Sequence, residues 1–267
     1  MKGQLFDLTG RVAIVTGGAQ WLGYDVANVL AEYGSHVIIT SRTVEKLAGL
    51  IAQMKERYPQ SDFLALPLDQ KDPESIQKMA DDAFSWKGHI DILYNNAGGG
   101  SGKSEGNLFE RSPEAIKDMI DTNLTGCLLC CRAVGAYMVR QGHGKIINTG
   151  SIAGIVGRDR SMYNDSGVKE QPIDYAAAKS GVIGMTRDLA GLMSPLGVHV
   201  NSISPGGFDK GELPAAFVER YASETMLGHM GVFGQDIKGA ALFLASDASN
   251  YVTGHNLVVD GGFSVWK

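Results

Sequence analysis

Residues 12–23 read VAIVTGGAQWLG: a short apolar run, a glycine-rich turn and the start of a helical pattern. Val26, Val29 and Leu30 then recur at the spacing of one helix face, within residues 22–33. The opening run is apolar throughout rather than alternating, which is typical of a strand buried on both faces. We therefore interpret residues 12–33 as a strand, a tight turn and a helix, the first unit of a parallel sheet.

The same alternation of apolar runs and amphipathic stretches repeats along the chain. Further strands are predicted at residues 36–40, 63–68, 90–94, 145–148, 198–204 and 257–259. Helices are predicted at residues 43–58, from residue 72, and at 112–142, 172–193 and 236–246. Because crossovers between parallel strands are right-handed, this order predicts a doubly wound, Rossmann-like α/β sheet of about seven strands, with helices on both faces. No repeat, linker or composition break divides residues 1–267, so we expect one domain.

The composition excludes several classes of protein. The chain has 267 residues and a formal net charge of −5, which disfavours nucleic-acid binding and a polybasic membrane anchor. No apolar run is long enough to span a membrane and no export signal is visible, so we expect a cytoplasmic protein. The three cysteines lie close together at residues 127–131, and the six histidines are scattered. We therefore expect neither a disulfide framework nor a metal site.

Ligands of doubly wound sheets bind beyond the carboxyl ends of the strands, so the residues that follow each strand are the candidates for function. The glycines at 17, 18 and 23 would let backbone N–H groups approach a pyrophosphate at a helix N-terminus, although such turns also occur for steric reasons alone. Ser41 and Arg42 follow the second strand, where a carboxylate would bind a ribose 2′-hydroxyl. A guanidinium there suits a 2′-phosphate instead, which favours NADP(H) over NAD(H); the alternative is a solvated arginine. Asp69, after Leu68, is placed to contact an adenine or to cap a turn.

Four more motifs follow later strands. They are Asn95-Asn96-Ala97-Gly98, Thr149-Gly150-Ser151, Tyr175 with Lys179, and Pro205-Gly206. The i, i+4 spacing of Tyr175 and Lys179 places the phenol and the ammonium on one helix face. A lone pair of this kind is common by chance and is often a surface pair.

In this order, the motifs resemble those of the short-chain dehydrogenase/reductase family, including its members that act on gluconate or on 3-oxoacyl thioesters. The resemblance runs from about residue 8 to 262 and also includes Asn123. It implies a dinucleotide-binding and catalytic domain that transfers a hydride between a nicotinamide and a carbonyl or alcohol. Tyr175 would be the general acid or base, and Lys179 would lower its pKa and bind the nicotinamide ribose. Ser151 would bind the substrate oxygen, and Asn123 would hold a water that relays protons to Lys179.

The resemblance also implies a set of residues that bind the cofactor. They are Gly17, Gly18, Gln20, Trp21, Leu22, Gly23, Ser41, Arg42, Leu68, Asp69, Asn95, Ala97, Gly98, Tyr175, Lys179, Pro205 and Gly206.

The sequence departs from the family pattern in three places. The middle glycine of the turn, expected at Trp21 or at Gln20, is absent, and the indole would either cover the cofactor or obstruct it. Ser151 and Tyr175 are about twice as far apart as usual because of a polar insertion at about 157–172, which is either a wall of the substrate site or an exposed loop or oligomer contact. Residues at about 208–230 replace the usual threonine after the Pro-Gly pair and could form a lid over the substrate.

These observations lead to one expected function and two alternatives. We expect an oxidoreductase for a polar carbonyl or alcohol, such as a sugar, sugar acid or polyol, assembled as a homotetramer or homodimer through helices 113–141 and 172–193. One alternative is a reductase of 3-oxoacyl thioesters, which the acidic charge balance disfavours. The other is a sensor or scaffold in which Trp21 has altered cofactor binding; the presence of Ser151, Tyr175, Lys179 and Asn123 together argues against it.

Overall fold

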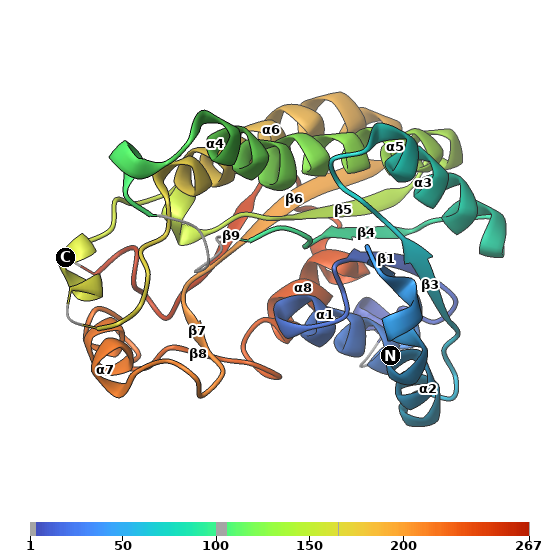
Figure 1. The fold of residues 1–267 in the computed structure, drawn as a ribbon. Helices are drawn as coiled ribbons and strands as arrows, with labels where there is room; N and C mark the ends of the chain where they lie inside the picture. Colours follow the sequence, from blue (N-terminus) through green and yellow to red (C-terminus); the bar gives the residue numbers. More distant parts are fainter. Residues whose placement is uncertain (1–3, 100–105, 165, 267) are drawn as a thin grey trace.

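A seven-stranded parallel sheet forms the centre of the computed structural model, which describes residues 4–99, 106–164 and 166–266 (Figure 1). Its strand order is β3-β2-β1-β4-β5-β6-β9. The strands are β1 (Val12–Thr16), β2 (His36–Ser41), β3 (Phe63–Pro67), β4 (Ile92–Asn95), β5 (Gly144–Thr149), β6 (Val198–Pro205) and β9 (Asn256–Val259). The strand order reverses between β1 and β4: β2 and β3 are added to one side of β1 and the later strands of this sheet to the other, and ligands bind at this position in such folds. The predicted doubly wound sheet is confirmed.

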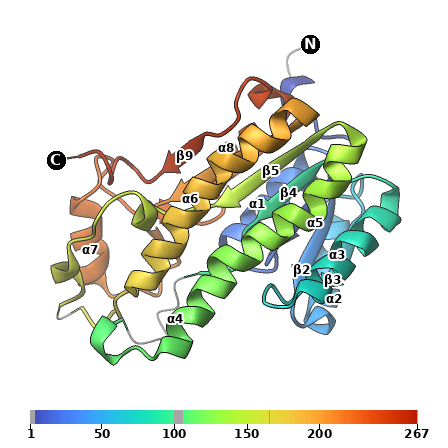
Figure 2. The same cartoon turned by 90° about the horizontal axis from the view of Figure 1, so that it is seen from above.

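Helices cover both faces of the sheet (Figures 1 and 2). One layer contains α1 (Trp21–Glu32), α2 (Ala48–Arg57) and α8 (Lys238–Ala245). The other contains α3 (Pro73–Lys87), α4 (Pro113–Ile120), α5 (Gly126–Gln141) and α6 (Ile173–Met193). Alternate strand residues point into the two layers: Ala13 and Val15 pack with α1 and α8, while Val12 and Ile14 pack with α3 and α5. This is why residues 12–15 of β1 are apolar at four successive positions.

The helix predicted over residues 112–142 is interrupted in the structure. The chain passes from α4 through a π-helical turn, Asp121–Thr125, before α5 begins. Single π-helical turns insert an extra residue, shift the side chains that follow and are frequent at functional sites. This turn contains Asn123, which is buried.

A small unit beyond the main sheet was only partly predicted. It consists of a second, two-stranded parallel sheet, β7 (Phe208–Asp209) and β8 (Gly231–Val232), with α7 (Ala215–Ser223) between them (Figure 1). Phe217 and Tyr221 of α7 form a separate apolar cluster with Met162, which belongs to the inserted segment. The predicted lid and the predicted insertion therefore pack against each other.

Candidate active site

A cavity of about 890 Å³ lies at the carboxyl ends of the central strands. Its volume is in the range of small-molecule and cofactor sites. All four candidate catalytic residues line it, and so do twelve of the other residues predicted to bind a cofactor. Those twelve are Gly17, Gln20, Trp21, Leu22, Ser41, Arg42, Leu68, Asp69, Ala97, Gly98, Pro205 and Gly206.

Asn95, Gly18 and Gly23 do not line the cavity. The side chain of Asn95 is buried behind it, where Nδ2 donates to Asn148 Oδ1 at 2.9 Å and contacts Cys131 Sγ. Asn95 is the last residue of β4 and its side chain points into the core, so this side chain does not form the cavity wall as expected, and a contact of Asn95 with a cofactor stays a prediction. Its neighbour Asn96 lines the cavity instead.

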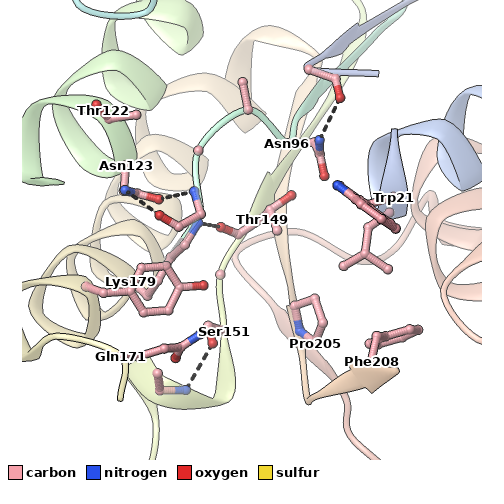
Figure 3. A pocket seen from close by; sticks show the side chains of 18 of the residues that line it. Trp21, Asn96, Thr122, Asn123, Thr149, Ser151, Gln171, Lys179, Pro205 and Phe208 are labelled. Carbon is pink, nitrogen blue, oxygen red and sulfur yellow. Dashed lines mark hydrogen bonds between the residues drawn. The ribbon is translucent and has the colours of Figure 1, made fainter. Parts of the chain in front are cut away.

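Asn96 and the glycines shape the turn between β1 and α1. The Asn96 side-chain amide donates to the carbonyl oxygens of Thr16 and Gly17 at 3.1 and 3.3 Å (Figure 3). A Cβ on Gly23 would lie 2.4 Å from Asn96 Nδ2 and 2.6 Å from the Gly17 oxygen. Gly23 therefore permits a close approach of helix and strand, while Gly17 supplies the positive φ of 63° that the turn needs.

Trp21 occupies a backbone position that favours glycine. Its φ is 55°, and no other non-glycine residue in the described parts of the chain has a positive φ. Gln20 is extended, with φ −157°, so the absent glycine of the family pattern corresponds to Trp21 and not to Gln20. The indole is 44% exposed and forms part of the cavity wall opposite Asn123, Lys179 and Ser151 (Figure 3). Among the described residues, no side-chain cap hydrogen bond is formed at Gln20, the N-cap of α1, so the first N–H groups of this helix can face an anion.

Ser151, Tyr175 and Lys179 meet on that opposite wall. Ser151 follows β5, where its Oγ accepts from the Ala153 N–H at 3.1 Å, and it lines the same wall as Tyr175. Lys179 lies one turn after Tyr175 on α6, with Nζ 5.7 Å from the Tyr175 ring centroid. The Lys179 ammonium donates to the Thr149 carbonyl at 2.7 Å (Figure 3).

The protonation of the Tyr175–Lys179 pair departs from the simple expectation. Burial raises the pKa of Tyr175, while the hydrogen bond with Ser151 and the charge of Arg158 lower it. Burial also lowers the pKa of Lys179 to about 8. Lys179 was expected to lower the pKa of Tyr175, but its ammonium lies beside the ring and burial is the dominant effect. In this structure the phenol is therefore held in its protonated, proton-donating form.

Asn123 ties the π-helical turn to the loop after β4. Its Oδ1 accepts from the Gly99 N–H at 2.8 Å, and its Nδ2 donates to the Met119 carbonyl at 3.1 Å. A Cβ on Gly98 would lie 2.7 Å from the same Oδ1, so glycine is required at this contact. Asn123 thus shapes the wall beside Lys179, and its proton-relay role stays a prediction.

The far end of the cavity carries charged side chains of both signs. Arg42 lines it together with Lys71, and no carboxylate stands at the end of β2, which reads Thr40-Ser41-Arg42. The two acids nearby are engaged: Asp118 pairs with Lys71 at 2.7 Å, and Asp69 accepts from the Lys71 N–H at 2.9 Å.

These features fit a nicotinamide dinucleotide. The glycine turn and the N-terminus of α1 suit a pyrophosphate, and the guanidinium of Arg42 beyond β2 suits a phosphorylated ribose. The buried Ser151–Tyr175–Lys179 group would then lie at the nicotinamide end. Together these parts form one continuous cavity.

Several other lining residues come from the predicted insertion at 157–172 and from the predicted lid at 208–230 or just after it. Arg158, Tyr163 and Gln171 come from the insertion, and Phe208, Phe217, Tyr221 and Phe233 come from the small unit beyond the sheet. Both segments were expected near the substrate, but which of their side chains line the cavity is decided by tertiary packing and could not be predicted. The insertion does carry one signal, since its two ends flank Ser151 and Tyr175.

The chain matches a family model described as Enoyl-(Acyl carrier protein) reductase over residues 17–264. It is 34% identical over 260 residues to a 3-oxoacyl-[acyl-carrier-protein] reductase of Escherichia coli, with 96% of this chain and 98% of the relative covered. The chain belongs to the short-chain dehydrogenase/reductase family. The predicted family is confirmed, and the protein is an oxidoreductase of this family.

Other members of the family act on different substrates. A 3alpha-hydroxysteroid dehydrogenase of Mediterraneibacter gnavus is 33% identical over 257 residues, which cover 95% of this chain and 97% of that protein. The solved structure of a gluconate 5-dehydrogenase from Burkholderia cenocepacia, in complex with NADP and tartrate, has a TM-score of 0.88 at 30% identity and covers 100% of both chains. The relatives thus support hydride transfer at hydroxyl or carbonyl groups.

The described residues contain neither a membrane-spanning helix nor a cluster of potential metal ligands. No helix in residues 4–99, 106–164 and 166–266 is long and apolar enough to cross a membrane. Within the same residues, no group of three or more potential metal-binding side chains comes together.

Proposed function

We propose that the protein is an NADP(H)-preferring oxidoreductase that interconverts a polar ketone and the corresponding secondary alcohol, with Tyr175 as the proton donor and acceptor. The observation that carries the proposal is the convergence of Ser151, Tyr175 and Lys179 in one cavity with the glycine turn. Gln171 and Arg158 add polar contacts beside Tyr175 that suit a polar substrate.

The residues divide the proton chemistry among them. When bound, the nicotinamide supplies the hydride for reduction or accepts it in oxidation. Ser151 is placed to donate a hydrogen bond to the substrate oxygen, on which negative charge develops during reduction. Tyr175 donates its phenolic proton to that oxygen, which completes the alcohol, and the phenolate regains a proton from solvent. Lys179 steadies the phenolate with its positive charge.

The preference for NADP(H) rests on Arg42 and on the absence of a carboxylate at the end of β2. Lys71 lines the same end of the cavity, but its ammonium is paired with Asp118 at 2.7 Å, so Arg42 carries the argument. A phosphate on the ribose would gain charge-assisted hydrogen bonds with the guanidinium, which a plain ribose could not make. The NADP in the related gluconate 5-dehydrogenase supports the same preference.

A homo-oligomer, either a tetramer or a dimer, is also proposed. Leu128 of α5 and Leu192 of α6 are 41% and 65% exposed on the two helices expected to form an interface. Light scattering during size-exclusion chromatography measures the assembly directly. A cytoplasmic location stays a prediction.

The proposed reaction is tested by mixing the protein with NADPH and a panel of ketones and following the loss of cofactor absorbance. The proposal expects alcohol formation by the wild type and its loss in Tyr175→Phe, with NADPH binding retained. Turnover that survives in Tyr175→Phe would contradict the assigned chemistry. A substrate profile restricted to 3-oxoacyl thioesters would favour the alternative function.

A further inference from the structure

The insertion at 157–172 forms one wall of the cavity beside Tyr175. Five of its residues line the cavity: Arg158, Tyr163, Val168, Lys169 and Gln171. Of the two interpretations of this segment, a substrate wall or an exposed loop, the geometry favours the wall. Figure 3 shows Gln171 next to Ser151 at this end of the cavity.

Arg158 is held in that wall by neutral groups alone. Its Nη1 donates to Gln171 Oε1 at 2.5 Å and to the Tyr163 hydroxyl at 3.5 Å, and its Nη2 donates to the Gln171 carbonyl at 3.3 Å. No carboxylate of the described residues pairs with it. These hydrogen bonds fix the orientation of the half-buried guanidinium, although burying a charged group without an oppositely charged partner is unfavourable.

The neighbouring carboxylates of the insertion form ion pairs with other arginines. Glu170 pairs with Arg160, and Asp159 pairs with Arg220 of α7. The other described arginine of the insertion, Arg160, is therefore paired with a carboxylate, whereas Arg158 has no carboxylate partner among the described residues and lines the cavity. A structural arginine in the same place would be expected to use one of these carboxylates.

The charged and apolar side chains around Arg158 determine which kind of anion this end of the cavity can bind. The second cation of this wall is Lys169, and the two acids that line the cavity, Asp69 and Asp118, lie at its far end next to Lys71. The charge of Arg158 also reaches Tyr175, whose pKa it lowers. Apolar side chains of the cluster around Phe217 complete this end.

We propose that Arg158 is the specificity-determining residue of the substrate site and binds the carboxylate of an oxo acid or hydroxy acid whose carbonyl or hydroxyl lies at Ser151 and Tyr175. The planar fork of a guanidinium matches a carboxylate through two parallel hydrogen bonds. Gln171 and Tyr163 position the fork, and the apolar cluster receives the carbon skeleton. This inference rests on the proposed function and narrows its substrate class to carboxylic acids.

The test compares acids with their own neutral esters. Benzoylformate and methyl benzoylformate form one pair, and levulinate and methyl levulinate form a second in which the carboxylate is farther from the ketone. For at least one pair, we expect the wild type to reduce the acid with a kcat/KM at least about 10-fold above that of the ester, because charge-assisted hydrogen bonds are the strong ones. Arg158→Gln should abolish this ratio, mainly through the KM of the acid, and Arg158→Lys should restore part of it.

Arg160→Gln is the matched control, since Arg160 lies in the same segment and pairs with Glu170 outside the cavity lining. It should retain the wild-type ratio of acid to ester. The inference is overturned if the wild type prefers neither acid, or if Arg158→Gln and Arg160→Gln change the ratio equally.

A binding measurement separates this inference from the proposed reaction. Thermal shift without cofactor should show stabilisation by phenylacetate that phenylacetamide does not give, and Arg158→Gln should remove it. Equal effects of the acid and the amide on the wild type would overturn the inference. Failure of the proposed function would give a different result. The protein would then reduce neither the esters nor the acids, but phenylacetate would still stabilise it more than phenylacetamide does.

Discussion

The ammonium of Lys210 lies over the indole ring of Trp21, with 3.9 Å between Nζ and the ring centroid. Trp21 also packs against Phe233, whose ring centroid is 5.6 Å away. Lys210 and Phe233 belong to the small unit that closes one end of the cavity. The residue that replaces the family's glycine therefore links the cofactor turn to this unit, and the indole is directed toward the unit.

This arrangement predicts that Trp21 covers the cofactor and does not obstruct it. Trp21→Gly would relieve the strain of a left-handed backbone but would lose the contacts with Lys210 and Phe233. We expect the Kd for NADPH to be unchanged or weakened by up to about 10-fold, as measured by the fluorescence of the bound cofactor. Tighter binding would show that the indole obstructs the site.

Substitutions of Tyr175 and of Ser151 are expected to lower kcat to different extents. Tyr175→Phe removes the proton donor and should lower kcat by about 10²–10⁴-fold. Ser151→Ala removes one hydrogen bond to the developing negative charge and should lower kcat by about 10²–10³-fold. Steady-state kinetics checks both, and cofactor binding should persist in each. A Ser151→Ala variant with full activity would remove Ser151 from the mechanism.

The pH dependence of ketone reduction should report on Lys179. Its pKa is lowered by burial to about 8, whereas burial raises the pKa of Tyr175 and keeps the phenol protonated. As pH rises through about 8, the ammonium is lost first, so kcat/KM for reduction should fall from there. If kcat/KM falls only above about pH 10, where an unperturbed phenol titrates, the loss of activity would be assigned to deprotonation of Tyr175 instead.

The same shift has a consequence for stability. Between about pH 8 and the ordinary lysine pKa near 10.4, the unfolded chain binds more protons at this position than the folded chain. The contribution of Lys179 to the free energy of unfolding should therefore rise with pH across that window. Lys179→Met should flatten this part of the pH–stability curve. A curve identical to that of the wild type would contradict the lowered pKa.

The close packing of other atoms around Gly23 predicts that one added methyl group will lower the stability of the protein. Gly23→Ala would place Cβ against Asn96 and the Gly17 oxygen, and overpacking of this kind should lower the melting temperature by roughly 5 °C. Gly49→Ala is the control, because it lies in α2 with no atom within 4 Å of the added Cβ and should stabilise the helix slightly. Equal melting temperatures for the two variants would contradict the geometry of the turn.

The regular elements could be predicted from the sequence because each carries its own local signal. Asp72 caps α3 by accepting from the Glu74 N–H, and Gly142 ends α5 with a φ of 76°. The π-helical turn at Asn123 and the pairing of β7 with β8 could not be predicted, since both depend on contacts made across the fold. Arg158 is similar: its position in the insertion was visible, but its neutral partners and its place in the cavity wall arise only from tertiary packing.

Titration of the wild type and of Arg42→Ala with NADPH and with NADH, followed by cofactor fluorescence, tests the central claim most directly. If the cavity binds a phosphorylated ribose at Arg42, NADPH should bind the wild type at least about 10-fold more tightly than NADH, and Arg42→Ala should remove the difference. A preference for NADH would contradict the role of Arg42 and leave the oxidoreductase chemistry in place. Binding of neither cofactor would contradict the account as a whole and would favour a sensor or scaffold in which Trp21 closes the site.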